Sequence, residues 1–354
     1  MAWAEPEYSS ADVNWAGNTL RSATDFFTAD MNHALQIINN WRAAHAFPLN
    51  TFQITLRQRG RKLQAENPLV SQRTKRLVSI YAKLEARPTM RLTQMQDIVG
   101  CRAVMRSTPV VLKLADVYRN GDFSHELKTE KDYITTPKRD GYRGIHLVYK
   151  YRGTSRNACY DGMLVEVQLR SRPQHAWATA VETAGTFTGQ ALKSNQGSKQ
   201  WLRFFALMGS AIAAAENSPP VPGTPMRIAE LRDELRDIEQ RLGVLQVLRA
   251  YRTTVQNAPR KGKYFLIQLD PETQEVRLSV FGASESQRAN ELYTQLEASI
   301  DKGSMRQVVL VSVESIAALK RAYPNYFLDT DVFMKLVQRV LVPPPPPPRV
   351  RAVG

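Results

Sequence analysis

The chain has 354 residues, 43% of them hydrophobic, and its 48 Lys or Arg against 33 Asp or Glu give a formal net charge of +15. This length exceeds one ordinary hydrophobic core, so we expect two domains, and the charge favours a polyanionic partner such as a nucleotide or RNA, although solubility alone also explains it. Two cysteines exclude a disulfide framework and a zinc site, and without a signal peptide or a membrane-spanning apolar run we expect a cytoplasmic protein.

The first half of the chain is expected to combine helices with short strands. Apolar side chains recur at helical intervals through residues 1–50, and residues 51–87 continue as helix with a break near Asn67 and Pro68. Three apolar strands and two further helices are then expected, at residues 98–105, 144–151 and 163–169 and at residues 173–183 and 199–215. This order indicates a mixed α/β domain.

The second half is expected to open with a linker. Residues 217–225 contain four prolines and a glycine, which cannot continue the preceding helix. Apolar residues then repeat with the spacing of a heptad, at Ile228, Leu231, Leu235, Ile238, Leu242 and Leu245. Because this seam is short, we favour a helix hairpin within the chain over a free coiled coil.

A small ββαβα unit is expected to follow. Its strands and helices are predicted at residues 264–269, 276–281, 285–300, 307–313, 315–322 and 332–341. The proline run at residues 343–348 is typical of polyproline II. We therefore divide the chain into an N-terminal helical segment, an α/β domain, a linker, a C-terminal domain and a proline-rich tail, at residues 1–50, 51–216, 217–225, 226–342 and 343–354.

Charged residues of the α/β domain concentrate in four segments, at residues 73–84, 97–102, 131–146 and 166–170. In the first segment, Lys75, Ser79 and Lys83 fall on one face of the predicted helix, and apolar residues fall on the opposite arc. Together with Arg73, this face could bind the β- and γ-phosphates of a nucleotide. A solvated basic helix face is the alternative.

Two carboxylates lie on the predicted strands. Asp97 precedes the apolar run 98–101, where a carboxylate is costly without a cation, and Mg²⁺ is the natural one; a helix N-cap or an ion pair with Arg102 is the alternative. Strand alternation places Glu166 on a polar face together with Gln168 and Arg170. This face suits a general base or a second metal ligand, although it is also typical of an ordinary half-exposed strand.

The third segment contains a turn that presents an aromatic side chain. Tyr142 follows Asp140 and Gly141, and basic residues surround it at Lys131, Lys138, Arg139 and Arg143. The ring could stack on a nucleobase, and a core tyrosine in a hairpin turn is the alternative.

In this order, the four segments resemble the RelA/SpoT synthetase family of nucleotide pyrophosphokinases, with a match from about residue 57 to residue 207. The resemblance implies a nucleotidyltransferase-like mixed sheet flanked by helices, and transfer of the β,γ-pyrophosphate of ATP to a ribose 3′-hydroxyl. It assigns the ATP phosphates to Arg73, Lys75, Ser79 and Lys83. It assigns Mg²⁺ to Asp97, with Glu166 as the carboxylate that activates the hydroxyl and as the second candidate metal ligand. The expected acceptor site comprises Lys131, Lys138, Tyr142, Arg143, His146, Gln168 and Arg170.

The sequence departs from the long bifunctional members of this family. None of its five histidines is followed by Asp, so the hydrolase pair of those enzymes is missing. In the C-terminal domain, Tyr323-Pro-Asn-Tyr326 resembles the Tyr-x-x-Tyr neutralising segment of the fused toxin–antitoxin, CapRel-like branch. That resemblance implies the tRNA 3′-CCA end as acceptor, and autoinhibition by Tyr323 and Tyr326 until a phage protein such as a capsid protein relieves it. A core tyrosine pair is the alternative.

Three functions therefore remain open. The first is a tRNA pyrophosphokinase toxin of phage defence, which the basic patch Arg57, Arg59, Arg61 and Lys62 favours because backbone contacts dominate RNA affinity. The second is a synthetase of ppGpp or pppGpp that uses GDP or GTP, with the C-terminal domain as an allosteric module. The third is a catalytically silent nucleotide-binding regulator, against which the intact carboxylates argue.

Overall fold

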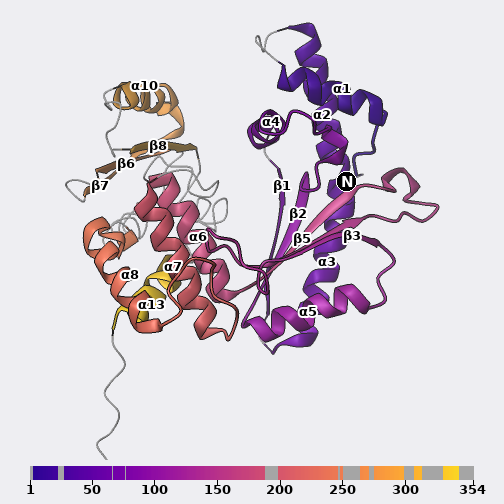
Figure 1. The fold of residues 1–354 in the computed structure, drawn as a ribbon. Coiled ribbons are helices and arrows are strands. Elements are labelled where there is room, and N and C mark those ends of the chain that lie inside the picture. Colours follow the sequence, from indigo (N-terminus) through magenta and orange to yellow (C-terminus); the bar gives the residue numbers. More distant parts are fainter. Residues whose placement is uncertain are drawn as a thin grey trace, which may run out of the picture. The chain divides into compact units, whose positions relative to one another are not determined.

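The structure is a computed structural model of the chain (Figure 1). It describes residues 3–22, 28–65, 67–75, 77–187, 198–245, 248–249, 264–270, 275–298, 307–312 and 330–342. The chain divides into two compact units, one formed by residues 1–134 and 144–172 and the other by residues 135–143 and 173–354. The domain boundaries expected from the sequence stay predictions, and each unit is described by itself.

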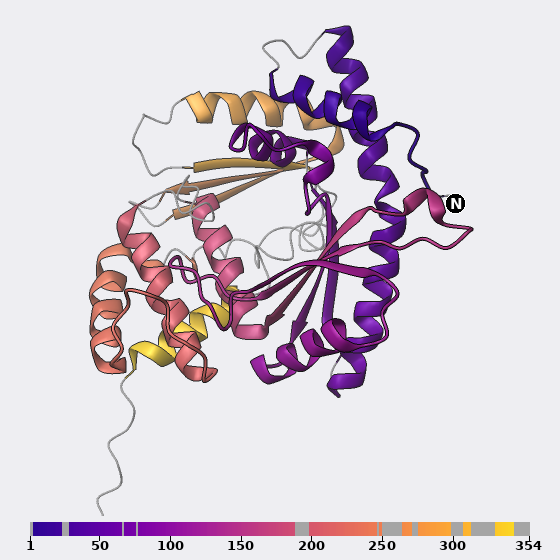
Figure 2. The same ribbon diagram turned by 45° about the vertical axis from the view of Figure 1, so that its right-hand side comes forward.

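The first unit contains a five-stranded mixed sheet in the order β1-β2-β5-β4-β3 (Figures 1 and 2). Its strands are β1 (Leu69–Thr74), β2 (Val99–Met105), β3 (Glu126–Asp132), β4 (Ile145–Lys150) and β5 (Leu164–Ser171). The central pair β2 and β5 is parallel, and the other three pairs are antiparallel. This confirms the mixed α/β class and the three apolar strands expected from the sequence.

The sequence analysis did not predict the two edge strands, β1 and β3. Residues 69–74 were expected to be helical, which is wrong, because they pair along their whole length with β2. Strand β3 carries charged side chains, among them Glu126, Lys128 and Glu130, and most of them are exposed. An edge strand has one free side and little burial, so its hydrophobic pattern is weak.

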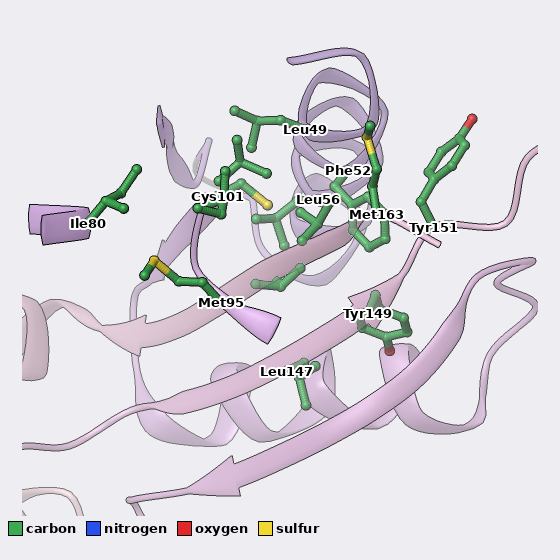
Figure 3. Close-up of a cluster of buried hydrophobic side chains, with 14 of the residues drawn as sticks. Leu49, Phe52, Leu56, Ile80, Met95, Cys101, Leu147, Tyr149, Tyr151 and Met163 are labelled. Carbon is green, nitrogen blue, oxygen red and sulfur yellow. The ribbon is translucent and has the colours of Figure 1, made fainter. Parts of the chain in front are cut away.

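Helices surround this sheet. They are α1 (Ser10–Arg21), α2 (Ala29–Ala44), α3 (Ala46–Leu63), α4 (Leu77–Glu85) and α5 (Thr108–Asn120), with short 3₁₀ turns η1 (Leu92–Gln94) and η2 (Ala158–Tyr160). Helices α3 and α5 pack on β2 and β5 and on each other, so they cover one face of the sheet. Side chains of α3 and of the strands form the core between them (Figure 3). Cys101 lies in this core, as expected, and is 2% exposed.

The second unit contains a helical core. Its helices are α6 (Arg172–Phe187), α7 (Lys199–Ala215), α8 (Ile228–Leu242) and α13 (Thr330–Leu341). The predicted heptad lies on α8, where Leu231, Leu235 and Ile238 are buried in this core. Helix α8 packs against α7 and α13, so the seam serves packing within the chain, as the hairpin interpretation expected.

The proline-rich linker is held tightly against α7. The Val221 amide donates to the Ser210 hydroxyl at 2.8 Å, and the Thr224 hydroxyl lies 2.6 Å from the same oxygen. Val221 is 1% exposed. The linker therefore continues the helical core instead of separating two domains by a free segment.

The second unit also contains a three-stranded antiparallel sheet in the order β7-β6-β8. Its elements are β6 (Tyr264–Asp270), β7 (Glu275–Phe281), η4 (Ala283–Glu285), α10 (Ser286–Ala298) and β8 (Gln307–Ser312). Together with α13 they confirm the predicted ββαβα order, and the helix predicted at residues 315–322 lies outside the described residues. No described helix is both long and apolar enough to cross a membrane.

A buried histidine at the α2–α3 junction makes the stability depend on pH. His45 is 1% exposed, its Nδ1 donates to the Trp41 carbonyl at 2.7 Å, and burial lowers its pKa from 6.5 to about 4. The unfolded chain therefore takes up this proton at a higher pH than the folded chain. Stability conferred by neutral His45 is present above pH 6.5 and is lost as the pH falls toward 4.

We expect the free energy of unfolding to fall by about 3 kcal/mol between pH 7 and pH 4 from His45 alone. Urea unfolding at several pH values measures this slope, and His45→Gln should flatten it. A smaller slope should remain in the variant because burial also lowers the pKa of His125. Equal slopes in both proteins would contradict the assignment to His45.

Candidate active site

Polar side chains occupy the centre of the sheet on one face, and the strand register sets their order. Arg73 of β1 pairs with Gly100 of β2, which in turn pairs with Glu166 of β5. The next row across the sheet is formed by Arg102, Gln168, His146 and Lys131. Alternation along β2 and β5 directs the apolar neighbours of these residues into the core under α3 and α5. The predicted polar face of β5 therefore extends over all strands of the sheet.

Asp97, just before β2, is held by two lysines. Lys75 Nζ lies 2.8 Å from Oδ2 and Lys83 Nζ lies 2.6 Å from Oδ1. Burial alone would raise the pKa of Asp97, but the hydrogen bonds and charges of the two lysines outweigh it and lower the pKa to about 2. The carboxylate is therefore ionised at neutral pH. The predicted alternatives, a helix N-cap and an ion pair with Arg102, do not describe these contacts.

The two lysines reach Asp97 from different elements. Lys83 lies in the last turn of α4, whereas Lys75 lies between β1 and the start of α4 at Leu77. The Lys75 amide donates to the Ile98 carbonyl at 2.8 Å, which brings the chain next to β2. The prediction that Lys75, Ser79 and Lys83 share one helix face is thus wrong for Lys75. Ser79 is exposed on α4, and Arg73 is exposed near the end of β1.

Glu166 has a hydrogen-bond partner on each carboxylate oxygen. His146 Nδ1 lies 2.8 Å from Oε1, and Gln168 Nε2 donates to Oε2 at 2.6 Å. Burial and the charge of Asp97 act to raise the pKa of Glu166, but the bonds from His146 and Gln168 prevail and lower it. The acceptor-site prediction named His146 and Gln168, and the structure joins both to Glu166 directly.

Two neighbours of Glu166 were not singled out as site residues. A Cβ atom at Gly100 would lie 3.2 Å from the Glu166 carbonyl oxygen and 3.6 Å from Oε2, so the glycine leaves space beside the carboxylate. Arg102 is 7% exposed and faces Gln168 across the β2–β5 pair. Alternation along β2 from Gly100 is the signal that would have placed Arg102 on the polar face.

The remaining acceptor-site residues differ in exposure and in position. Lys131 lies on β3 and is exposed, in register with His146. Arg170 is 7% exposed, and its Nη2 lies 3.4 Å from the Gln168 side-chain oxygen. Lys138, Tyr142 and Arg143 belong to the second unit.

In the second unit, the predicted Tyr142 turn packs on α6 and α7. Lys138 Nζ lies 5.1 Å from the centre of the Tyr142 ring, a distance typical of a cation–π contact. The Tyr142 ring meets the Trp177 ring edge-on, with centres 6.3 Å apart. Arg143 is 2% exposed and donates to the Pro219 carbonyl, which favours a structural role for it over contact with an acceptor.

The donor set of the first unit fits a divalent cation such as Mg²⁺. Asp97 and Glu166 are carboxylates close enough for the charge of one to act on the other. In the part of the chain that the structure describes, no cluster of three or more His, Cys, Asp or Glu side chains could hold a metal by itself. Mg²⁺ takes one or two carboxylates and completes its shell with water and phosphate oxygens. Asp97 would hold it, with Glu166 as the second carboxylate.

We expect His146→Ala to raise the pKa of Glu166, because burial would remain while the hydrogen-bonding partner that lowers this pKa is lost. A ¹³C NMR titration of the glutamate carboxyl groups measures this shift. His33→Ala, at an exposed position of α2, is the matched control. An unchanged Glu166 titration in His146→Ala would show that the contact does not control the carboxylate.

Comparison with known proteins agrees with the motifs. Residues 72–188 match the family model described as the region found in RelA / SpoT proteins. GTP pyrophosphokinase YjbM of Bacillus subtilis (strain 168) is 30% identical over 113 residues, which are 31% of this chain and 52% of that protein. The probable chloroplastic GTP diphosphokinase RSH2 of Arabidopsis thaliana is 32% identical over 111 residues, 30% of this chain and 14% of that protein. The chain thus spans about half the length of the first relative and far less of the second.

A solved structure adds a weaker likeness. The small alarmone synthetase 1 from Bacillus subtilis, bound to its product pppGpp, has 20% sequence identity and a TM-score of 0.42, and the match covers 51% of this chain and 94% of that chain. The CapRel-like branch stays a prediction. Residues 72–188, which contain both lysines, Asp97 and Glu166, are therefore similar to the region found in RelA / SpoT proteins.

Proposed function

We propose that the chain is an ATP-dependent pyrophosphokinase that transfers the β,γ-pyrophosphate of ATP to a ribose 3′-hydroxyl. One observation carries this proposal: the first unit contains both the Lys75–Asp97–Lys83 cluster and Glu166, on the polar face of the sheet. The relatives over this region are named GTP pyrophosphokinase and probable GTP diphosphokinase, which supports the reaction class.

In this reaction a bond forms between the 3′-oxygen and the β-phosphorus, the bond between the β-phosphorus and the α,β-bridging oxygen breaks, and AMP leaves. Glu166 accepts the hydroxyl proton, since its lowered pKa keeps it ionised at neutral pH. His146 and Gln168 fix the orientation of this carboxylate through its two oxygens. The proton goes to the carboxylate oxygen that faces the acceptor, and Gly100 leaves the space for it.

Lys75 and Lys83 supply the positive charge for the triphosphate. Both ammonium groups are gathered at Asp97, so they are positioned before a nucleotide arrives, and Arg73 is exposed near the end of the neighbouring strand. Mg²⁺ bound at Asp97 would supply further positive charge to the β- and γ-phosphate oxygens. Phosphoryl-type transfer depends largely on such positioning and charge, which fits a site built from cations and two carboxylates.

For the acceptor, we propose the tRNA 3′-CCA end, in an autoinhibited cytoplasmic toxin of phage defence. The formal charge of +15 and the exposed Arg61 and Lys62 at the end of α3 support a polyanion. Arg59, part of the same predicted patch, serves the fold instead, because its guanidinium lies over the Tyr118 and Phe123 rings, 4.8 and 4.6 Å from their centres.

The second candidate is synthesis of ppGpp or pppGpp from GDP or GTP, and the names of the relatives favour it. In that case the C-terminal region would regulate the enzyme as an allosteric module. Tyr142 beside Lys138 suits a stacked base in either acceptor.

The test uses ATP labelled at the γ-phosphate, the full-length chain with Tyr323→Ala to remove the proposed autoinhibition, and either bulk tRNA or GDP with GTP. We expect label in tRNA, and label in a guanosine tetra- or pentaphosphate would select the second candidate. Glu166→Gln should reduce transfer by about 10²–10⁴-fold, the usual contribution of a general base. Glu85→Gln, an exposed carboxylate of α4, is the control and should transfer normally. Label in neither acceptor, or full activity of Glu166→Gln, would contradict the proposal.

Tyr323 and Tyr326, which lie outside the described residues, are proposed to hold the enzyme inactive. We expect Tyr323→Ala and Tyr326→Ala to make the chain toxic when expressed, and Glu166→Gln in the same chain to abolish that toxicity. Colony counts after induction measure both effects. Full-length variants are required, because a chain cut near residue 220 would lose α8 and α13 from the core of α7. Soluble tyrosine variants without toxicity would rule out the autoinhibition.

A further inference from the structure

Helix α2 lies outside the matched family region, residues 72–188, and contacts the Lys75–Asp97–Lys83 cluster. Arg42 Nε donates to the Lys75 backbone carbonyl at 3.1 Å, and Arg42 Nη1 donates to the Asn39 side chain at 3.0 Å. The guanidinium thus bridges its own helix and the segment between β1 and α4. Lys75 is held at three points, since its amide bonds to Ile98 and its ammonium group bonds to Asp97.

Helix α1 contacts the η1 turn, which comes just before Asp97 in the chain. Asn14 accepts hydrogen bonds from the Thr93 amide at 3.1 Å and from the Thr93 hydroxyl at 2.9 Å. Thr93 belongs to the η1 turn that leads toward Asp97. A Cβ atom at Gly17 would lie 2.7 Å from Leu92 Cβ, so the backbone of α1 approaches this turn closely. Figure 1 shows α1 and α2 beside α4, and α1 also packs on α4.

We propose that Arg42 is a positioning residue of the nucleotide site: it fixes the Lys75 backbone so that the Lys75 ammonium group is presented at Asp97. The inference rests on the proposed function and deepens it, because it makes the N-terminal helices part of the ATP site. Arg42 touches the Lys75 carbonyl and acts through Lys75. Lys75 lies before α4 begins at Leu77, and Arg42 Nε holds its carbonyl there.

Arginine suits this position for a geometric reason. One planar guanidinium donates in two directions, to a carbonyl of one element and to an amide side chain of another. A lysine at residue 42 could not reproduce this fork. Small displacements matter at such a site, because a shift of about 1 Å in a positioned group can cost about 10²-fold in rate.

Arg21 offers a matched control. It lies on α1, its Nη1 donates to the Pro88 carbonyl beyond α4, and its Nη2 donates to the Asn18 side chain at 2.8 Å. Like Arg42, it therefore donates to a loop carbonyl and to an asparagine three residues earlier. Unlike Arg42, it makes no bond to Lys75 among those bonds. A loss of general packing would affect Arg21→Met and Arg42→Met alike.

The experiment uses the full chain with Tyr323→Ala, which removes the proposed autoinhibition, and measures binding of α,β-methylene-ATP by calorimetry, together with Tm and the KM for ATP. We expect Arg42→Met to raise the Kd and the KM about tenfold or more, while its Tm matches that of Arg21→Met, which binds normally. Arg42→Lys should not restore binding. Asn39→Ala, which removes only the support of the guanidinium, should weaken binding in the same direction by a smaller factor.

A double-mutant cycle with Lys75→Met decides whether Arg42 acts through Lys75. We expect Arg42→Met to add almost nothing once Lys75 is gone, because coupled residues are not additive. Normal binding by Arg42→Met, or full additivity with Lys75→Met, would overturn the inference. A Tyr323→Ala chain that binds the analogue and transfers no pyrophosphate would refute the proposed function alone, since binding in the double-mutant cycle could still be measured. A Tyr323→Ala chain that binds no analogue would refute both.

Discussion

The first unit is organised around one half-buried electrostatic contact, the carboxylate of Asp97 between the ammonium groups of Lys75 and Lys83. A carboxylate placed at the mouth of an apolar strand would be costly without partners, and here each oxygen has one. The contact joins the end of β1, helix α4 and the start of β2, so the two ammonium groups and the carboxylate are fixed by each other. Any anion that binds these lysines must compete with this carboxylate for them, which makes its affinity a difference between two large electrostatic terms.

Much of this arrangement could be predicted from residue patterns. Motif spacing identified both lysines, and alternation along β5 placed Glu166 and Gln168 on one face, as observed. Contacts between distant residues could not be predicted, because no local pattern encodes them. His146 meets Glu166 across 20 residues of sequence, and Arg42 meets Lys75 across 33. The edge strands were missed for a related reason, since their stability comes from pairing with β2 and β4 and not from their own composition.

The second unit is not one continuous stretch of the chain, because residues 135–143 pack with residues 173–354. The loop 135–143 leaves the first unit and packs on α6 and α7, where Gly141, at φ +92°, takes a backbone conformation that suits glycine. A Cβ atom at Gly209 would lie 2.8 Å from Gly141 Cα, so the loop and α7 touch through their backbones. Helix α7 in turn shares its core with α8 and α13, where the Phe205 and Phe333 ring centres lie 5.9 Å apart. The loop that carries Tyr142 therefore packs on α7, which itself shares a core with helices of the predicted C-terminal domain.

The proline-rich stretch between α7 and α8 has a consequence for protein engineering. Prolines between helices usually mark a place where a chain can be cut, and where a domain can be exchanged between relatives. Here the stretch is tied to α7 by the Ser210 hydroxyl and to the Tyr142 loop by Arg143. A chimera joined at this stretch would pair α7 with a foreign α8 and expose or overfill the shared core. An exchange between relatives would have to carry α7, α8 and α13 together, because these three helices share one core.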